Sequence, residues 1–234
     1  MIKSNLKALA KRAAYALPSS YVLMLHHVTA EPALPKSGCL LDTGAFRQFM
    51  GRIERYVSVD ELLQGAPSGS FAVTFDDGLE DHYTVAYPFL RQRGIPFTAF
   101  LVTDFLDQPG YITRAQLAEL CRDPLFTVGA HGVTHRVLSE LSPAEQETEL
   151  ARSKQLLEDM TGGPVRYFAY SHGQYNRDTL EQAKCYAAAF TTSERPFNAL
   201  SGHNRLAIPR YNLDSNSLER QTRLFERLRL LRAR

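Results

Sequence analysis

The chain has few cysteines, no long apolar run and none of the glycine-rich motifs that bind nucleotides. Its three cysteines are odd in number, lie far apart and form no CxxC pair, so they support neither a disulfide framework nor a thiolate zinc site and favour a reducing compartment. No stretch approaches the roughly 18 apolar residues that a membrane span needs. P-loop, GxGxxG and GxSxG motifs are also missing, so phosphate-loop, dinucleotide-binding and acyl-serine chemistry lack their residues.

The remaining composition is that of a folded domain. The 234 residues are 44% hydrophobic and 22% charged, with a mean hydropathy of −0.27, which excludes a disordered or linker-like chain. Because roughly 200–250 residues commonly form one barrel, we expect a single domain over residues 1–234.

Charge is distributed unevenly along the chain. The formal net charge is +2, but residues 1–17 and residues 216–234 each carry +4, which leaves −6 on the body between them. An acidic body argues against nucleic acid as a partner. Both ends have the pattern of basic amphipathic helices, which either pack onto the domain or contact an anionic membrane surface. Residues 1–17 lack the long apolar segment of a secretion signal, so we expect a cytoplasmic protein, peripheral at the inner face of the membrane if the basic ends bind it.

Apolar segments alternate with segments of helical period, which predicts an α/β fold with parallel strands. Seven strands are expected, at Tyr21–Leu25, Phe71–Phe75, Pro96–Val102, Leu125–Ala130, Tyr167–Tyr170, Ala187–Thr191 and Arg205–Ile208. Helices are expected at Thr43–Tyr56, Val59–Gln64, Leu79–Arg93, Thr113–Arg122, Pro143–Met160 and Arg177–Lys184. Helical crossovers between parallel strands favour a sheet or barrel over a sandwich.

Two polar clusters at predicted strand ends carry the clearest chemistry. In the first cluster, the predicted strand Phe71–Phe75 is followed by Asp76, Asp77 and Gly78. Adjacent carboxylates at the mouth of a buried sheet repel each other, and they persist mainly where a cation or a division between metal ligand and proton carrier stabilises them. A simple Asp-Asp-Gly turn is the alternative. The second cluster holds His131 and His135, which would share one face of a helical turn and which, with one carboxylate, make a three-ligand site for a catalytic divalent metal.

Two further clusters also follow predicted strands: the pair His26 and His27, and the segment from Tyr170 through His172 to Gly173. Each alone is as well explained by core or loop residues. In a parallel barrel, however, all four strand ends lie on one face, where barrel enzymes build their sites. A mononuclear iron oxygenase site uses similar ligands, but its usual scaffold is all-β.

These residues resemble the NodB-type polysaccharide deacetylases, carbohydrate esterase family 4. Thr74-Phe-Asp-Asp-Gly78 is similar to the first family motif and His131-Gly-Val-Thr-His135 to the second, and the resemblance extends from about Tyr21 to Asn212. It implies a distorted (β/α) barrel of about seven parallel strands. It also implies a hydrolase that removes N-acetyl groups from an amino sugar of a glycan or glycan precursor, with Asp77, His131 and His135 binding Zn²⁺, or another divalent cation such as Co²⁺ or Ni²⁺, and Asp76 as the general base.

A permuted branch of the family carries its acidic histidine near the N-terminus, in a strand that ends Tyr-His. The segment Leu23-Met-Leu-His-His-Val28 resembles it, with Leu25 in place of the tyrosine. The resemblance therefore implies His26 as the catalytic acid, with His27 beside it at the substrate.

The third family motif departs from the usual pattern, because Ser171 and His172 stand where proline and tyrosine are common. The resemblance implies substrate or oxyanion contacts for Tyr170, His172 and Gly173. Classical members hold the catalytic aspartate with an arginine from this motif, where Ala169 stands here, and Arg210 is the predicted substitute.

Three functions stay open at this point. The basic ends favour a lipid-linked sugar as the substrate of an N-deacetylase. Removal of formyl or another acyl group would use the same residues. A catalytically inactive, sugar-binding homologue is the third possibility, since the third motif is altered.

Overall fold

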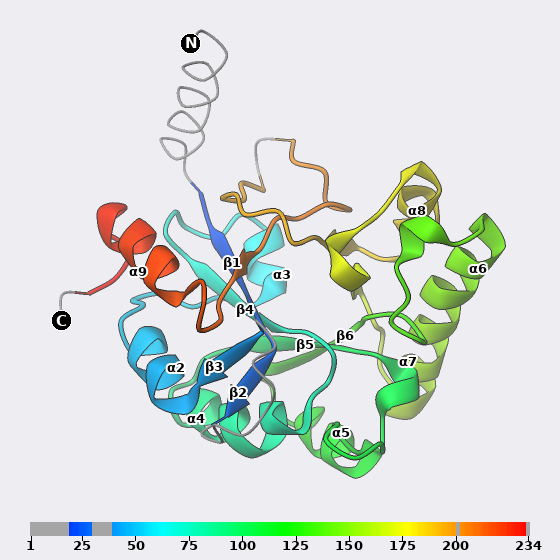
Figure 1. The fold of residues 1–234 in the computed structure, drawn as a ribbon, viewed down its shortest axis with the longest axis horizontal. Helices are drawn as coiled ribbons and strands as arrows, with labels where there is room; N and C mark the ends of the chain where they lie inside the picture. Colours follow the sequence, from blue (N-terminus) through cyan, green and yellow to red (C-terminus); the bar gives the residue numbers. More distant parts are fainter. Residues whose placement is uncertain (1–18, 30–38, 200–201, 233–234) are drawn as a thin grey trace, which may run out of the picture.

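Seven parallel strands form one curled sheet in the computed structural model, which describes residues 19–29, 39–199 and 202–232 (Figure 1). The strand order is β8-β7-β6-β5-β4-β1-β9, and every neighbouring pair runs parallel. The strands are β1 (Tyr21–Leu25), β4 (Phe71–Phe75), β5 (Phe97–Leu101), β6 (Phe126–Ala130), β7 (Tyr167–Ala169), β8 (Ala188–Phe190) and β9 (Tyr211–Asn212). The predicted distorted barrel of about seven parallel strands is confirmed.

The last strand lies later in the chain than Arg205–Ile208, where the sequence predicted it. Ile208 forms a parallel bridge with Phe190 of β8, whereas β9 pairs with β1 at the opposite edge of the sheet. The segment between β8 and β9 therefore spans the gap between the two sheet edges. Pro209 lies between Ile208 and β9 and has no N–H to donate. This explains why strand pairing is interrupted between the part of the segment that meets β8 and the part that meets β1.

Both faces of the sheet are buried. On β4, Phe71, Val73 and Phe75 pack against the outer helices, while Ala72 and Thr74 face the interior of the barrel. This explains why the strands read as nearly continuous apolar runs. The interior is filled at one end by rings such as Phe100, Phe190 and Tyr167, together with residues of the short helix α3 (Val59–Leu63).

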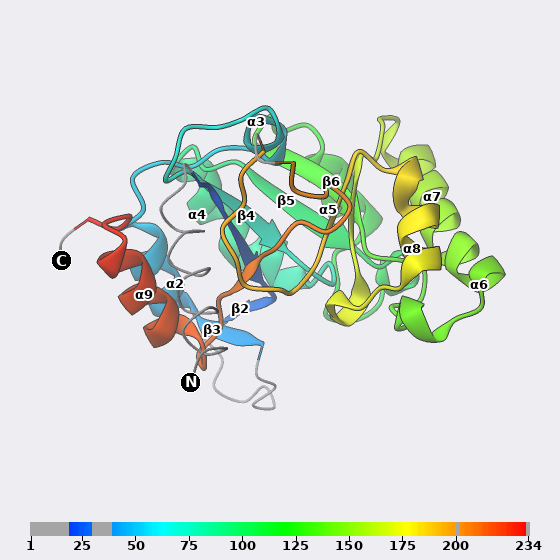
Figure 2. The same ribbon diagram turned by 90° about the horizontal axis from the view of Figure 1, so that it is seen from above.

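Helices lie around the outside of the sheet. They are α2 (Thr43–Met50), α4 (Tyr87–Gln92), α5 (Arg114–Leu120), α6 (Pro143–Glu147), α7 (Ser153–Thr161), α8 (Arg177–Gln182) and α9 (Leu218–Arg227). Figure 2 shows α9 beside α2 at one side of the molecule and α6, α7 and α8 at the opposite side. Two short parallel strands that the sequence did not predict, β2 (His27–Thr29) and β3 (Leu40–Asp42), form a separate small sheet.

Two of the predicted helices are divided by π-helical turns. The helix predicted at Leu79–Arg93 consists of a π-helical turn, η1 (His82–Ala86), followed by α4. The helix predicted at Pro143–Met160 consists of α6, a π-helical turn, η4 (Thr148–Arg152), and α7. A π-helical turn keeps the chain helical but shifts the phase of the side chains around the helix axis. The period of the apolar residues therefore predicts the helix but not the π-helical turn within it. The helix predicted at Thr43–Tyr56 ends earlier, at Met50.

The basic C-terminal segment packs onto the sheet over residues 218–227. The ring of Phe225 in α9 is fully buried, with its centroid 5.4 Å from that of Tyr21 and 5.0 Å from that of Phe71. The apolar side of this helix is thus used by the core, as the packing interpretation predicted. The N-terminal helix predicted over residues 1–17 lies outside the described residues. Within the described ranges, the helices are too short and too polar to cross a membrane.

Candidate active site

The two adjacent carboxylates lie where β4 ends. Asp76 continues the pairing with β1, since its N–H donates to the carbonyl of Leu25 at 2.9 Å, and the residue is only 3% exposed. At Asp77 the backbone turns into the left-handed region, with φ of 75°, and Gly78 follows with φ of 74°. This turn directs the two carboxylates to different partners, because a left-handed residue breaks the regular alternation of a strand.

Asp76 forms a buried, bidentate ion pair with Arg210. Nη1 and Nη2 of Arg210 each lie 2.6 Å from a carboxylate oxygen of Asp76, and the guanidinium is held over the ring of Phe100 at 5.4 Å. Burial alone would raise the pKa of Asp76, but the charge of Arg210 and its hydrogen bonds outweigh it and lower that pKa. The contact predicted for Arg210 is therefore present, and it keeps Asp76 ionised.

Asp77 faces two imidazoles. Its Oδ1 lies 3.4 Å from Nε2 of His131 and 3.2 Å from Nε2 of His135, and the three ligand atoms lie within 4.8 Å of one another. Nδ1 of His131 donates to the carbonyl of Ala169 at 2.7 Å, so in the neutral imidazole Nε2 carries the lone pair that would bind a metal. Oδ1 of Asp77 is buried and has no hydrogen-bond donor among the described residues. One carboxylate and two imidazoles that converge in this way fit a divalent metal ion with open positions.

His131 and His135 do not lie on a helical turn, so that prediction is wrong. They lie at the two ends of an irregular loop after β6, in which Gly132 and His135 have φ of 86° and 65°. A left-handed backbone is uncommon for a residue with a side chain and is found at functional sites, where the surroundings hold it. The spacing of four brings the rings together through this loop, with centroids 4.9 Å apart.

The two adjacent histidines after β1 have different surroundings. His26 lies among the charges of Asp76, Asp77 and Arg210, its Nδ1 is buried without a hydrogen-bond partner in the described part of the chain, and burial lowers its pKa. Nδ1 of His27 is bonded at 2.7 Å to Asp81, and this hydrogen bond raises the pKa of His27. His26 is therefore the histidine beside the carboxylates, and His27 is paired outside them.

The third motif contributes only part of what was predicted. His172 is left-handed, with φ of 56°, and its ring centroid lies 5.0 Å from that of His135. Gly173, with φ of 70°, has no room for a side chain, since a Cβ would approach Thr192 Oγ1 to 2.2 Å. Tyr170, by contrast, is fully buried and its hydroxyl donates to a backbone carbonyl at 2.8 Å. Its side chain packs in the core, so the predicted substrate contact is not seen for Tyr170.

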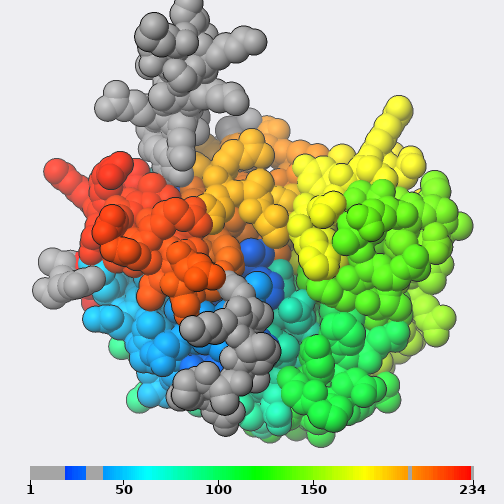
Figure 3. Space-filling view, viewed as in Figure 1, coloured from blue at the N-terminus to red at the C-terminus, as the bar shows by residue number. Residues whose placement is uncertain are grey.

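An aromatic pair that the sequence analysis missed borders the metal-binding group. The ring of Phe105 lies 6.1 Å from that of His135 and 4.7 Å from that of Tyr111, and both side chains are partly exposed. Tyr111 is held near the carboxylates by a bridge to Leu79. Figure 3 shows the region of β1 and β2, coloured blue, at the centre of a hollowed face between the orange and yellow segments.

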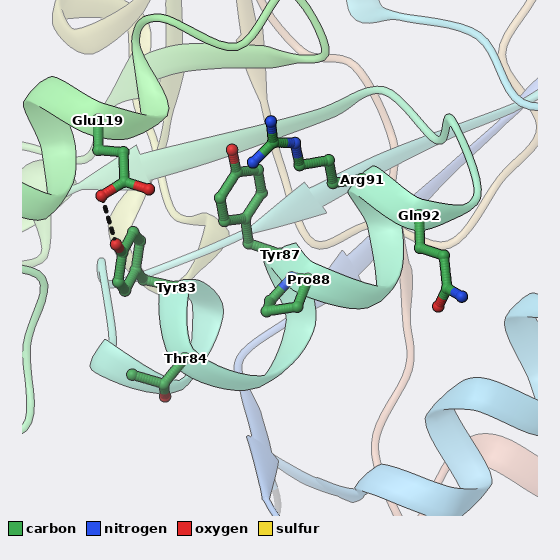
Figure 4. Close-up of a pocket in the computed structure, with 7 residues that line it drawn as sticks. All are labelled: Tyr83, Thr84, Tyr87, Pro88, Arg91, Gln92 and Glu119. Atoms are coloured by element: carbon green, nitrogen blue, oxygen red, sulfur yellow. Dashed lines mark hydrogen bonds between the residues drawn. The ribbon is translucent and has the colours of Figure 1, made fainter.

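A separate surface hollow of about 700 Å³ lies between α4 and α5 (Figure 4). Its two tyrosine hydroxyls are already paired: that of Tyr83 donates to Glu119 at 2.6 Å, and that of Tyr87 donates to Asp123 at 2.9 Å, next to Arg91. The three residues of the metal-binding group do not line it. This hollow therefore lies where α4 and α5 pack against each other, apart from the metal-binding group.

Comparisons with known proteins agree with this geometry. A model of the polysaccharide deacetylase family matches residues 64–190. YxkH of Bacillus subtilis, which its name assigns to the polysaccharide deacetylases, is 32% identical over 112 residues, and poly-β-1,6-N-acetyl-D-glucosamine N-deacetylase of Staphylococcus aureus is 24% identical over 183. The alignments cover 48% and 70% of this chain, but only 40% and 63% of those relatives. The solved structure of the Streptococcus pyogenes deacetylase PplD with acetate superposes with a TM-score of 0.77 at 25% identity, covering 88% of this chain and 97% of that one.

Proposed function

This chain belongs to the polysaccharide deacetylase family, and on that premise we propose that it is a metal-dependent hydrolase that removes N-acetyl groups from an amino sugar of a glycan or glycan precursor. One observation carries the proposal. An ionised carboxylate, Asp76, lies directly beside Asp77, His131 and His135, which can hold a divalent metal, and the partly buried His26 interacts electrostatically with both aspartates. Asp76 supplies a base, the metal-binding group a Lewis-acid site and His26 a candidate acid, all at the carboxyl ends of the strands.

Each residue of the cluster has a separate role in the proposed amide hydrolysis. A divalent metal held by Asp77, His131 and His135 supplies Lewis acidity toward the amide carbonyl and the attacking water. Asp76, which Arg210 keeps ionised, takes one proton from that water as its oxygen bonds to the acetyl carbon. His26 then donates a proton to the amide nitrogen as the C–N bond breaks, and acetate and a free amine leave. Burial lowers the pKa of His26, so its protonated form gives up its proton more readily than a free imidazolium does.

The first prediction concerns the metal. Protein purified without a metal-affinity tag is expected to contain one divalent metal per chain, and His131→Ala is expected to lose both the metal and the release of acetate from N-acetylglucosamine oligomers. Elemental mass spectrometry and an acetate assay measure the two quantities. The matched control is His203→Ala, because His203 is an exposed histidine outside the site. Full activity after exhaustive chelation, or a metal-loaded His131→Ala protein, would refute the metal-dependent mechanism.

The second prediction separates the two adjacent histidines. His26→Gln is expected to lower kcat by about 100-fold, since it removes the acid that protonates the leaving nitrogen. His27→Gln is expected to keep kcat within a few-fold, because His27 pairs with Asp81 outside the carboxylate cluster. Steady-state kinetics of both variants on the same oligomer decide the assignment. A larger loss for His27→Gln would assign the acid to the other histidine.

The substrate and the location remain part of this proposal. The Staphylococcus aureus relative is named for poly-β-1,6-N-acetyl-D-glucosamine, which makes β-1,6-linked N-acetylglucosamine oligomers the first substrate to assay. Product analysis by mass distinguishes loss of acetyl from loss of formyl. The proposed cytoplasmic location and the contact with an anionic membrane rest on the basic ends of the sequence.

A further inference from the structure

A buried glutamate outside the catalytic cluster holds the loop between the two metal-binding histidines. Glu149 is 5% exposed. Its Oε2 accepts the N–H of Val133 at 2.6 Å and the N–H of Thr134 at 3.0 Å, and its Oε1 accepts the hydroxyl of Thr134. All three donors lie between His131 and His135, so this one carboxylate binds the middle of the loop that carries two of the three candidate ligands.

The carbonyls of Gly132 and Val133 accept the N–H groups of Thr103 and Asp104, but no strand or helix of the structure accepts the N–H groups of Val133 and Thr134, so these depend on another partner. The N–H groups of Val133 and Thr134 have no other acceptor among the described residues, and a backbone N–H that loses its acceptor inside the protein destabilises the conformation that carries it. Gly132 lets the carboxylate approach: a Cβ there would lie 2.9 Å from Oε2 of Glu149, and its φ of 86° disfavours any other residue. The conformation of the loop and the position of the Glu149 carboxylate therefore fit each other closely.

Glu149 lies in the π-helical turn η4, between α6 and α7. Such single turns are rare and occur frequently at functional sites. The turn has no ligand or catalytic residue of its own, and its buried carboxylate has no cation within ion-pair distance among the described residues. Among the described residues, the carboxylate oxygens of Glu149 accept hydrogen bonds from loop groups alone, and burying a carboxylate without a cation is unfavourable unless such hydrogen bonds offset it.

We propose that Glu149 is a positioning residue, which sets the metal affinity of the site by fixing the loop that brings His131 and His135 to Asp77. This rests on the proposed function in one respect, namely that the three ligands bind a metal. The effect on the loop itself does not, since the hydrogen bonds exist without a metal.

Three variants test the proposal in the full chain. Glu149→Ala removes all three acceptors and is expected to weaken Zn²⁺ and Co²⁺ affinity about 10–100-fold, as is typical when a partner behind metal ligands is lost. Glu149→Gln is expected to stay within a few-fold of the parent chain, because its amide oxygen can accept both N–H groups while its NH₂ donates to the Thr134 hydroxyl. Glu147→Ala, at an exposed position two residues earlier, is the matched control and is expected to change nothing.

Three measurements are made on each variant. Competition with a chromogenic chelator gives the metal affinity, and the absorption spectrum of bound Co²⁺ reports the ligand geometry. Hydrogen exchange on metal-free protein reports the Val133 and Thr134 amides, whose protection is expected to fall in Glu149→Ala and to persist in Glu149→Gln.

The outcomes separate this inference from the proposed function. If the parent chain binds no metal, the proposed function fails, whereas the amide exchange still decides whether Glu149 holds the loop. Unchanged amide protection and metal affinity in a folded Glu149→Ala protein would overturn the positioning role, as would an equal loss in Glu149→Gln. If Glu149→Ala does not fold, Thr134→Val decides: it removes only the hydroxyl bond, and an unchanged metal affinity would overturn the proposal.

Discussion

Asp76→Asn is expected to lower kcat for N-acetylglucosamine oligomers by about 10²–10⁴-fold while the metal content stays at one per chain. The amide can still accept a hydrogen bond from Arg210, but it cannot take a proton from water. The metal stays because its three candidate ligands, Asp77, His131 and His135, are unchanged. Parallel measurement of kcat and of metal content therefore separates the base from the metal site.

Asp104→Asn is the matched control for this prediction. Asp104 is an exposed aspartate just after β5, at the same end of the barrel, and its backbone N–H donates to Val133. The substitution is expected to leave kcat unchanged. A variant of Asp76 that keeps a tenth of the parent activity would rule out its role as the base. If the parent chain itself turns over no substrate but binds oligomers as tightly as Asp76→Asn does, the inactive sugar-binding alternative holds.

The strands of the barrel could be predicted closely from the sequence, because both faces of the sheet are buried and each strand reads as a short apolar run. The segment around Ile208 could not, because it pairs with one sheet edge before Pro209 and with the other after it. Its position depends on how the whole sheet curls and not on its own pattern. The π-helical turns were missed for a related reason, since a local change of helical phase leaves the apolar composition unaltered.

Some residues of the candidate site could likewise be predicted from the sequence, and others could not. Groups that follow a strand directly, such as Asp76 and His131, could be predicted because the carboxyl ends of parallel strands meet on one face. Glu149 could not, since it lies on an outer helix and its sequence context resembles that of any exposed glutamate. The sequence predicted a substrate contact for Tyr170, whose side chain is buried in the core, because the sequence does not show which way the side chain at the end of a short strand points.

Arg210→Met is expected to lower the free energy of unfolding by about 3–5 kcal/mol, because it leaves the carboxylate of Asp76 buried without its partner. Methionine fills much of the volume between the rings of Phe100 and Phe190, so a large cavity is not the cause. Urea unfolding measures this change. Activity is expected to fall as well, and most at low pH: burial and the loss of Arg210 both raise the pKa of Asp76, so the ionised base forms only at higher pH.

A double-mutant cycle shows whether the pair, and not the packing of Arg210, accounts for the loss. Asp76→Asn combined with Arg210→Met removes both charges, so the double variant is expected to be more stable than the sum of the single changes predicts, by about 0.5–3 kcal/mol. Arg220→Met breaks the more exposed ion pair with Glu194 and is expected to cost about 0–1 kcal/mol. An Arg210→Met protein within 1 kcal/mol of the parent chain would contradict the assignment, because Arg210 is the one cation that is hydrogen-bonded to the buried carboxylate of Asp76 among the described residues.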